Sequence, residues 1–521
     1  MSFRDDVIGA AGLIAGLPGY LRHPLSLDEA QGAVRRRLEH READFLHVAR
    51  HAIFGNPTGP YATLLRSAGC ELGDLDRLVR SEGVEGALLT LYRCGVFLTV
   101  AEFKGRRPVI RGSTTISVNP RLLRNPRAAQ HYWTASSGSR GTPTSVPRDL
   151  TSQRDRAVNV YLTLAARGGL RWQKAVWTMS GLGPLLWYSL CGDPPVRWFS
   201  TIDPAERQHW RFGWRARAVR AAGRLAGVRL PRLEYVSLQA PDTIVRWMAQ
   251  TLREGKTPHL WVSPSSAVRL CRLAQATSTD LTGARFTVTG EPVTAARLAV
   301  IRAAGGDAVP DYGSAEAGGS VAYGCLAPDA PDDAHVFGDL HAVIRTEDPP
   351  LPHGALLISS LRPTAPFVLL NVAMGDRAVV TTRKCGCPLE AIGWPTHLHT
   401  IRSYEKLTAG GVTFVDTDVI GVLEEVLPRL FGGGPIDYQL LEEQADNGQP
   451  RLRLLVNPSI GPLDPRAVGD AFLAAIGEGS PIASGMTLHW RDGGFLRVER
   501  AVPRQTRSGK ILHLVAGARG E

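Results

Sequence analysis

The stretch "RFTVTGEPVTAARLAVIRAAGGDAVPDYG", residues 285–313, contains the pattern that decides the fold. It begins with a short apolar strand pattern, continues with helical spacing over residues 292–306, and ends in a second strand pattern that leads to residue 313. The same alternation extends over about residues 150–310, with "HLWVSP" at 259–264 as a further strand and "PDTIVRWMAQTLREG" at 241–255 as a further helix. Repeated strands and helices of this kind predict a layered α/β domain.

The segments on either side of this domain have different patterns. The first 125 or so residues favour helices, with an amphipathic helix over residues 21–53 that starts at Ser26 or Asp28, and then strands over 95–118. Residues 175–192 are the most apolar run, but glycines and a proline interrupt it, so we expect a kinked, buried helix there. About residues 330–400 are rich in strands, and the last 115 or so residues predict a small, separate α/β module.

Composition limits the classes of function. The chain has 521 residues and a formal net charge of +11, and arginine supplies most of the positive charge because the chain has only six lysines. No nucleic-acid-binding motif is evident, so a basic surface suits a polyphosphate ligand, an acidic carrier protein, or solvent alone. No apolar run is long enough to predict a transmembrane helix, Asp5 and Asp6 argue against a signal peptide, and the cytoplasm is the expected location. Seven cysteines, an odd number, argue against a disulfide framework.

The stretch "YWTASSGSRGTPTS", residues 132–145, gathers glycines and hydroxyl groups in one short segment. Backbone N–H groups of a glycine-rich turn can converge on anionic oxygens, and serine hydroxyls add further donors. The stretch is neither a Walker A sequence nor a G-x-S-x-G nucleophile elbow, which disfavours a serine hydrolase. Taken alone, it predicts either a phosphate-binding loop or an ordinary polar loop.

Four further stretches follow this loop in order: "TGEPV" at 289–293, "DYGSAEAG" at 311–318, "MGDRAVV" at 374–380 and "VPRQTRSGKI" at 502–511. In this order and spacing the chain resembles the adenylate-forming superfamily, which includes acyl-CoA synthetases, peptide-synthetase adenylation domains and luciferases. The resemblance covers about three quarters of the chain. It implies that ATP is bound by Ser136, Ser137, Gly138, Ser139, Arg140, Gly141, Gly290, Glu291, Pro292, Asp311, Tyr312, Gly313, Ser314 and Asp376.

The resemblance also implies individual roles for the main site residues. Tyr312 would stack on adenine, and Asp376 would bind the ribose. Glu316 would hold Mg²⁺, while Lys510 and Arg402 would act in catalysis. Fixed positive charge is what this chemistry needs, because a carboxylate attacks the phosphate of ATP and both reactants are anionic. The alternatives are an exposed basic loop residue for Lys510 and a helix-start carboxylate for Glu316.

The chain departs from the family pattern at three places. In the loop, Arg140 and Thr144 differ from the residues of the family pattern. The loop therefore lacks the family's lysine, and Arg140 would have to supply that charge. Ala315 replaces the family's threonine and removes a hydroxyl near the phosphates. Tyr404, followed by Glu405, stands at the family's hinge aspartate, so the hinge residue stays open.

A metal site is suggested by cysteine and histidine residues after Glu316. Phenylacetate-CoA ligases and acyl-protein synthetases have a similar cysteine, a following histidine and a later C-x-C, and the chain is most similar to this branch of the superfamily. The resemblance places the ligands of a structural zinc ion at Cys325, His335, Cys385 and Cys387. His341 competes with His335 for the histidine position, and unrelated buried thiols are the alternative to a zinc site.

The expected protein is therefore an α/β enzyme of two parts. Residues 1–402 would be an adenylation domain of sheets flanked by helices, with a helical lead-in over 1–125 and a small barrel-like part. Residues 403–521 would be a small, mobile lid that rotates between two states, with Gly410 and Gly411 approaching the site in the second.

The expected function is an ATP- and Mg²⁺-dependent carboxylate–CoA ligase, of the kind found in secondary metabolism. The alternatives are an acyl-AMP ligase that loads a carrier-protein thiol or an amine, and an inert nucleotide-binding regulator. The acid and the oligomeric state stay open. We expect the acid near residues 131–133, Val288 and Tyr312, with the aromatic residues between Trp177 and Tyr188 either lining its pocket or belonging to the core.

Overall fold

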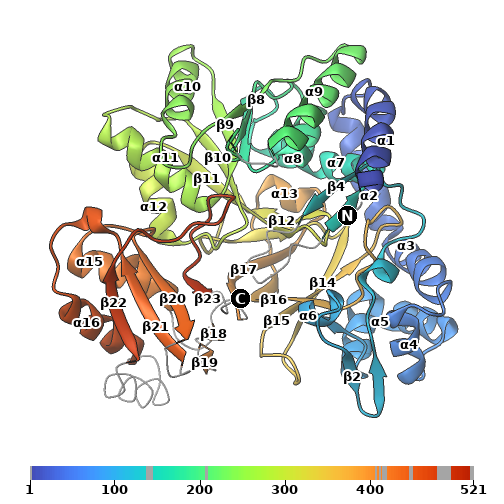
Figure 1. The fold of residues 1–521 in the computed structure, drawn as a ribbon. Helices are drawn as coiled ribbons and strands as arrows, with labels where there is room; N and C mark the ends of the chain where they lie inside the picture. Colours follow the sequence, from blue (N-terminus) through green and yellow to red (C-terminus); the bar gives the residue numbers. More distant parts are fainter. Residues whose placement is uncertain are drawn as a thin grey trace.

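The computed structural model describes residues 3–135, 145–205, 209–404, 408–409, 412–413, 419–444, 450–477 and 495–516. One large sheet is flanked by helices, and a smaller sheet with its own helices lies beside it near the C-terminus (Figure 1). The predicted α/β architecture, a large part followed by a small one, is therefore confirmed. The predicted phosphate loop, residues 136–144, lies outside the described residues.

The large sheet has the strand order β14-β15-β16-β17-β13-β12-β11-β10-β9-β6-β7-β8. Its strands from β11 to β8 in that order pair in parallel, and its strands from β14 to β11 pair antiparallel. The parallel strands are β6 (Gln173–Thr178), β7 (Arg197–Ser200), β8 (Leu233–Tyr235), β9 (Pro258–Val262), β10 (Arg285–Thr289) and β11 (Asp307–Ser314). The antiparallel strands are β12 (Gly319–Gly324), β13 (Ala334–Val336), β14 (His341–Thr346), β15 (Ala355–Ser360), β16 (Val372–Thr382) and β17 (Thr396–Ser403). Strands β13–β17 thus continue the large sheet through β12.

Helices connect the parallel strands, as the sequence pattern predicts. The strand–helix–strand unit of residues 285–313 is β10, α12 and β11, and β10 pairs in parallel with β11 from Arg285 to Thr289. The helices of this half are α7 (Leu150–Ala166), α8 (Leu182–Tyr188), α9 (His209–Leu225), α10 (Asp242–Arg253), α11 (Pro264–Ala276) and α12 (Ala295–Ala303). Because the carboxyl ends of parallel strands share one edge, β9 and β10 both deliver the residues that follow them to the same side of the sheet.

The N-terminal region is helical, with α1 (Phe3–Leu21), α2 (Leu27–Glu39), α3 (Arg41–Val48), a π-helical segment (Ala49–Phe54), α4 (Pro60–Ser67) and α5 (Leu72–Arg93). Of the two predicted start signals, Ser26 is the one used. Its side chain accepts a hydrogen bond from the Glu29 N–H, and the Glu29 side chain accepts one from the Ser26 N–H. The single helix expected over residues 21–53 is wrong in its length, since α2 stops before His40, whose N–H bonds to Arg36 and Leu38 carbonyls.

Two local predictions are wrong. Residues 175–192 do not form one kinked helix: they comprise most of β6 and all of α8, separated by Gly181, which has φ +59°. The expected strands over residues 95–118 are interrupted by the one-turn helix α6 (Val100–Phe103), which Thr99 and Glu102 cap reciprocally. The short strands around it are β1 (Leu98–Thr99), β2 (Val109–Arg111) and β3 (Thr114–Ile116), and α6 delivers Lys104 directly at its end.

The small C-terminal part has its own sheet and core. Its strand order is β22-β21-β20-β23, with bounds Leu496–Arg500, Pro450–Val456, Tyr438–Gln444 and Leu514–Ala516. Its helical segments are Val419–Gly421 (α14), the π-helical Val422–Val426 (η3), Leu427–Phe431 (α15) and Pro465–Gly477 (α16), and their apolar residues pack on the sheet. This part, orange and red in Figure 1, lies beside α12, and a 2.8 Å ion pair joins Arg272 of α11 to Asp437.

Within the described ranges, none of the helices has both the length and the apolar character needed to cross a lipid bilayer.

Candidate functional site

A cleft lies where the carboxyl ends of β10 and the middle of β11 face the C-terminal part. It encloses about 870 Å³ of space, counting the portion that is open to solvent. The predicted ATP-binding residues Gly290, Glu291, Pro292, Asp311, Tyr312, Gly313 and Asp376 all line it. Other lining residues come from a loop of the large sheet, from β17, and from the small part: Asp332, Ile401, Ser403, Ile420, Leu512, His513 and Leu514. Residues more than 200 positions apart in the sequence therefore share one cavity.

Tyr312 and Asp376 form the polar pair at one wall of this cleft. The Tyr312 hydroxyl donates a 3.2 Å hydrogen bond to Asp376 Oδ2, so the two residues predicted to bind adenine and ribose are in direct contact. Burial and the nearby Asp376 charge raise the pKa of Tyr312 well above its usual value, so the phenol stays protonated and remains a donor. An aromatic ring beside a carboxyl group suits a nucleoside, which offers a flat base and a diol.

The Lys510 side chain lies against Gly290, which is one of the lining residues of the cleft. Gly290 has φ +83°, and a Cβ at this position would clash with Nζ of Lys510. Two features favour glycine at this position: the left-handed backbone and the close approach of the ammonium. The loop that carries Lys510 is also tight at Gly509, which has φ +82° and packs against Leu238 and Ser266 of the large part.

Glu316, the predicted magnesium ligand, is buried and paired with a residue that the sequence analysis did not single out. Its Oε1 lies 2.9 Å from Nζ of Lys104, and the two side chains are only 6% and 15% exposed. Lys104 follows α6, so the small capped helix that interrupts the expected strands is what carries this ammonium to Glu316. Mg²⁺ prefers carboxylate oxygens as coordinating atoms. An ammonium next to such a carboxylate favours the binding of an anionic molecule.

The two strands that flank the predicted phosphate loop pair with each other. Strands β4 (Tyr132–Ala135) and β5 (Ser145–Arg148) pair antiparallel, with Ala135 opposite Ser145, so both ends of the loop leave the same place. Ser136, Ser137, Gly138, Ser139, Arg140 and Gly141 themselves lie outside the described residues. Arg148 at the end of β5 is buried. Burial lowers the pKa of Arg148, and Tyr132 and Glu316 oppose that shift.

Arg402 and Asp311 complete the polar lining. Arg402 ends β17 and donates to Asp332 Oδ2 at 3.2 Å, and the same carboxylate accepts the N–H groups of Thr400 and Ile401. Arg402 is thus joined to the cleft through Asp332. Burial raises the pKa of Asp311 to about 6, while hydrogen bonds from Ser320 and Trp261 limit the rise.

The aromatic residues between Trp177 and Tyr188 do not line this cleft. Trp177 is 1% exposed and donates its indole N–H to the Val236 carbonyl, and Trp187 donates to Gln153. Of the two alternatives open in the sequence, these contacts favour the core.

Cysteine and histidine side chains gather where β12 ends and β17 begins, beside β13. Donor atoms of Cys325, His335, Cys385 and His397 all lie within 4.8 Å of one another, so this group could hold a metal ion. Cys387 is adjacent, with Sγ 3.1 Å from His335 Nε2 and 4.0 Å from Cys325 Sγ. His341, the competitor for the histidine position, contacts Arg156 instead, at 3.1 Å.

The chemistry of these donors fits a transition-metal ion. His335 directs Nδ1 at the Trp394 carbonyl, 2.6 Å away, which leaves Nε2 facing the thiols. Burial lowers the pKa of His335 to about 4, so the ring is neutral, as a ligand must be. Burial would raise the pKa of Cys387, but backbone N–H groups of Leu326, Glu390 and Leu389 outweigh it and lower the pKa, favouring a thiolate.

His397 was missed in the sequence analysis, although it is part of this cluster. It lies directly opposite His335 in the antiparallel pairing of β13 with β17. Its Nδ1 lies 2.7 Å from Asp333 Oδ1, and its buried Nε2 has no hydrogen-bond partner in the described part of the chain. A carboxylate that orients a histidine in this way is a common companion of metal ligands. Only the strand register brings the two rings together.

Comparisons with known proteins show that the fold is similar to that of several solved structures. No protein-family model matches the sequence, and no curated protein matches it. Among solved structures, 2-hydroxyisobutyryl-CoA ligase in complex with 2-HIB-AMP and CoA is 15% identical, with a TM-score of 0.45 over 95% of this chain and 91% of that chain. The anthranilate CoA ligase AuaEII is 13% identical, with a TM-score of 0.45 over 78% of this chain and 69% of that chain. O-succinylbenzoate coenzyme A synthetase from Bacillus subtilis, in complex with ATP and magnesium, is 13% identical, with a TM-score of 0.44 over 74% and 69%.

These structures are similar to this chain and do not assign its activity. Identities of 13–15% and TM-scores below 0.5 leave the chemistry to be inferred from the residues of this chain itself.

Proposed function

We propose that the protein activates a carboxylic acid with ATP and Mg²⁺ as an acyl-adenylate, and then transfers the acyl group to the thiol of coenzyme A. One observation carries the proposal: the Lys510 ammonium lies against Gly290, and Gly290 lines the same cleft as the Tyr312–Asp376 pair. A nucleoside site with the ammonium of Lys510 close by suits an enzyme in which negative charge develops on a phosphate of the bound nucleotide.

The first step of the proposed reaction joins two anions. A carboxylate oxygen bonds to the α-phosphorus of ATP, and the bond from that phosphorus to the bridging oxygen breaks, so that pyrophosphate leaves. Tyr312 and Asp376 would hold the adenosine, while Lys510 would offset the negative charge that develops at the α-phosphate. In the second step the thiol sulfur bonds to the acyl carbon, the bond from that carbon to the phosphate oxygen breaks, and AMP leaves.

Glu316 and Lys104 would serve the phosphate end of the nucleotide. Mg²⁺, when bound, neutralises charge on the phosphate oxygens, and Glu316 is the carboxylate we propose to hold it. The predicted loop lacks the lysine of the family pattern, and Lys104 brings an ammonium to this end of the site from another part of the chain. We propose that Lys104 supplies the charge that the loop lacks.

The proposed function is tested by incubating the protein with MgATP, radioactive pyrophosphate and a panel of aromatic and aliphatic carboxylic acids. We expect at least one acid to support exchange of pyrophosphate into ATP, and CoA then to yield an acyl-CoA and AMP, identified by mass spectrometry. AMP without an acyl-CoA would shift the acceptor to a carrier-protein thiol or an amine. Bound ATP without exchange for any acid would favour the nucleotide-binding regulator.

We also propose that the cysteine–histidine cluster holds a structural zinc ion. Three thiols and two imidazoles converge there, and a tetrahedral structural site uses four such donors. Three of the ligands would be Cys325, Cys385 and His335, and the fourth is either the predicted Cys387 or His397. Such a site would tie the loop after β12 to β13, β17 and the turn before α13 (Pro388–Ala391).

Protein purified without chelators should contain about one zinc ion per chain by elemental analysis. Cys325→Ser should remove it and lower the melting temperature, because structural zinc contributes directly to folding. Cys94→Ser, an exposed cysteine elsewhere, is the matched control and should retain the metal. Comparison of Cys387→Ser with His397→Ala identifies the fourth ligand. Metal-free wild-type protein with an unchanged melting temperature would contradict the proposal.

A further inference from the structure

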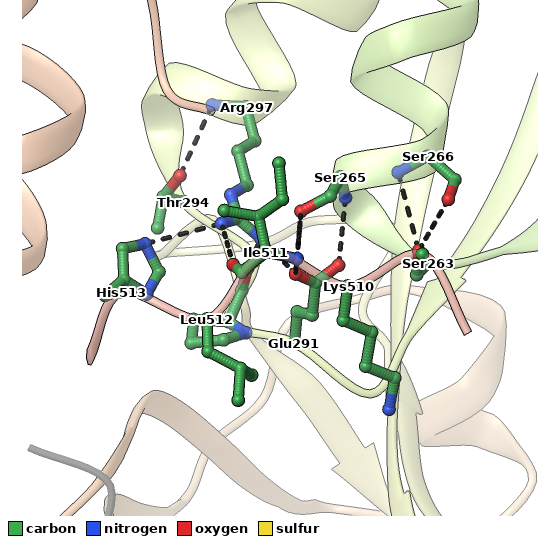
Figure 2. A network of polar contacts seen from close by, with 12 residues as sticks. Ser263, Ser265, Ser266, Glu291, Thr294, Arg297, Lys510, Ile511, Leu512 and His513 are labelled. Carbon is green, nitrogen blue, oxygen red and sulfur yellow. Dashed lines mark hydrogen bonds and ion pairs between the residues drawn. The ribbon is translucent and has the colours of Figure 1, made fainter. Parts of the chain in front are cut away.

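Glu291 lines the cleft, and its carboxylate is part of a network of polar contacts (Figure 2). The side chain is fully buried. Its Oε1 accepts hydrogen bonds from the Ser265 hydroxyl at 2.7 Å and from the Ile511 N–H at 2.8 Å, and its Oε2 accepts the Ser265 N–H at 3.0 Å. Ile511 directly follows Lys510. The carboxylate of Glu291 therefore fixes the peptide that carries the lysine.

Arg297 of α12 extends this network across the boundary between the two parts. Its Nη1 lies 3.5 Å from Glu291 Oε1, and its Nε donates at 2.7 Å to Glu424 Oε1 in the π-helical segment η3 of the C-terminal part. Its Nη2 donates to the Ile511 carbonyl at 3.4 Å. One guanidinium thus connects the large part, the helix of the small part and the segment next to Lys510.

Glu424 is the counterpart of Glu291 in the small part. Its Oε1 lies 2.6 Å from His513 Nε2, and its Oε2 accepts the Thr294 hydroxyl of the large part. Burial would raise the pKa of Glu424, but Arg297 and His513 outweigh it and hold the pKa at about 2, so the carboxylate is ionised near neutral pH. The His513 carbonyl in turn accepts the Leu440 N–H of β20, which fixes the segment to the small sheet.

The Lys510 loop has a second support on its other side. Arg269 donates to the Gly509 carbonyl at 2.7 Å and to Gln505 Oε1 at 2.9 Å. The peptides on both sides of Lys510 are therefore held by side chains of the large part, and Figure 2 shows the Lys510 side chain extending away from the Glu291 network.

From this arrangement we propose that Glu291, Arg297, Glu424 and His513 form a latch that positions Lys510 against Gly290, beside the cleft. The inference rests on the proposed function for the role of Lys510. Buried ion pairs between two parts of a chain add little net stability, because the cost of removing the charges from water offsets their attraction. Their main effect here would be to hold the two parts in one relative position. Movement of the C-terminal part away from α12 would break the contacts of Arg297 with Glu424 and of Ile511 with Glu291 together. The four residues are positioning residues, since they act through the Lys510 segment.

Hydrogen-exchange mass spectrometry of the full chain tests the latch without any substrate. Glu424→Gln keeps the shape of the side chain and removes its charge. We expect peptides that contain residues 511–513 to exchange at least about tenfold faster in this variant, while peptides of α5 stay unchanged. Glu425→Gln, at the adjacent exposed position, is the matched control and should exchange like the wild type.

The outcomes separate a positioning role from a merely structural one. Exchange at residues 511–513 within twofold of the control, or an equal increase in α5, would overturn the latch. If Glu424→Gln fails to fold, Thr294→Val removes the hydrogen bond to Glu424 together with the cap that the Thr294 hydroxyl gives the Arg297 N–H at the start of α12. This variant should speed exchange at 511–513 about threefold, and no change there would overturn the latch as well.

An activity measurement then addresses Lys510 itself. Once an exchanging acid is found, Glu424→Gln should lower kcat of pyrophosphate exchange at least tenfold and leave KM for ATP within twofold, since Tyr312 and Asp376 are untouched. A raised KM with unchanged kcat would contradict the positioning of Lys510. If no acid supports exchange, the proposed function fails, while hydrogen exchange still decides whether the latch exists.

Discussion

Lys510→Ala is expected to lower acid-dependent exchange of pyrophosphate into ATP by about 10²–10³-fold, the usual cost of removing one group that stabilises charge in a transition state. The physical reason is the position of the ammonium, which lies against Gly290, a residue that lines the cleft together with Tyr312 and Asp376. Two anions must approach each other in the proposed step. Removal of the cation therefore raises the free energy of the transition state more than the free energy of the complex with ATP. KM for ATP should therefore change much less than kcat.

The control for this experiment is Lys256→Ala. Lys256 is exposed and forms a 3.0 Å surface ion pair with Glu254, and such pairs contribute little to stability. Both variants should have the melting temperature of the wild type within a few degrees. Near-normal exchange in Lys510→Ala, with the control also active, would remove the lysine from the catalytic role and with it the main support for an adenylate-forming enzyme.

Loss of the Lys104–Glu316 pair has the second largest expected effect. Lys104→Ala and Glu316→Gln should each lower pyrophosphate exchange by about 100-fold or more, because a metal ion and an ammonium at the phosphates together offset several negative charges. In Glu316→Gln the activity should also need a higher Mg²⁺ concentration. The double variant should lose less than the product of the two single losses, since groups that act together are not additive.

Arg107→Ala is a suitable control for Lys104, because Arg107 is an exposed cation only a few residues away. A change of net charge alone would affect both variants equally. If Lys104→Ala exchanges pyrophosphate like Arg107→Ala, the ammonium at Glu316 has only a structural role, and the charge missing from the loop must come from another residue.

Local pattern was sufficient to predict much of the fold. The strand–helix–strand unit of residues 285–313 appears as β10, α12 and β11 because its apolar spacing changes from strand to helix and back within 29 residues. The predicted elements of the last 115 or so residues are present among those that the structure describes. Residues 175–192 were read wrongly, since a short apolar run fits a buried strand as well as a buried helix, and Gly181 marks a break instead of a kink.

The site could be predicted only where a motif carries it. Gly290, Asp311, Tyr312 and Asp376, which the resemblance assigns to ATP, line one cleft. Lys104, His397 and the latch could not be found in this way, because each depends on a contact between segments that are distant in sequence. Strand register and packing between the two parts decide these contacts, and neither has a local signal in the chain.

The pairing of β13 with β17 has a consequence for the way the C-terminal part is attached. His397 lies near the start of β17, and the same strand runs on to Arg402 and Ser403, directly before the proposed join. Asp333 holds His397, and its neighbour Asp332 holds Thr400, Ile401 and Arg402. A zinc ion at the cluster would clamp the base of this strand to the large sheet. We propose that the ion would then fix the strand that leads into the C-terminal part, so that its loss would loosen the attachment of that part to the large sheet.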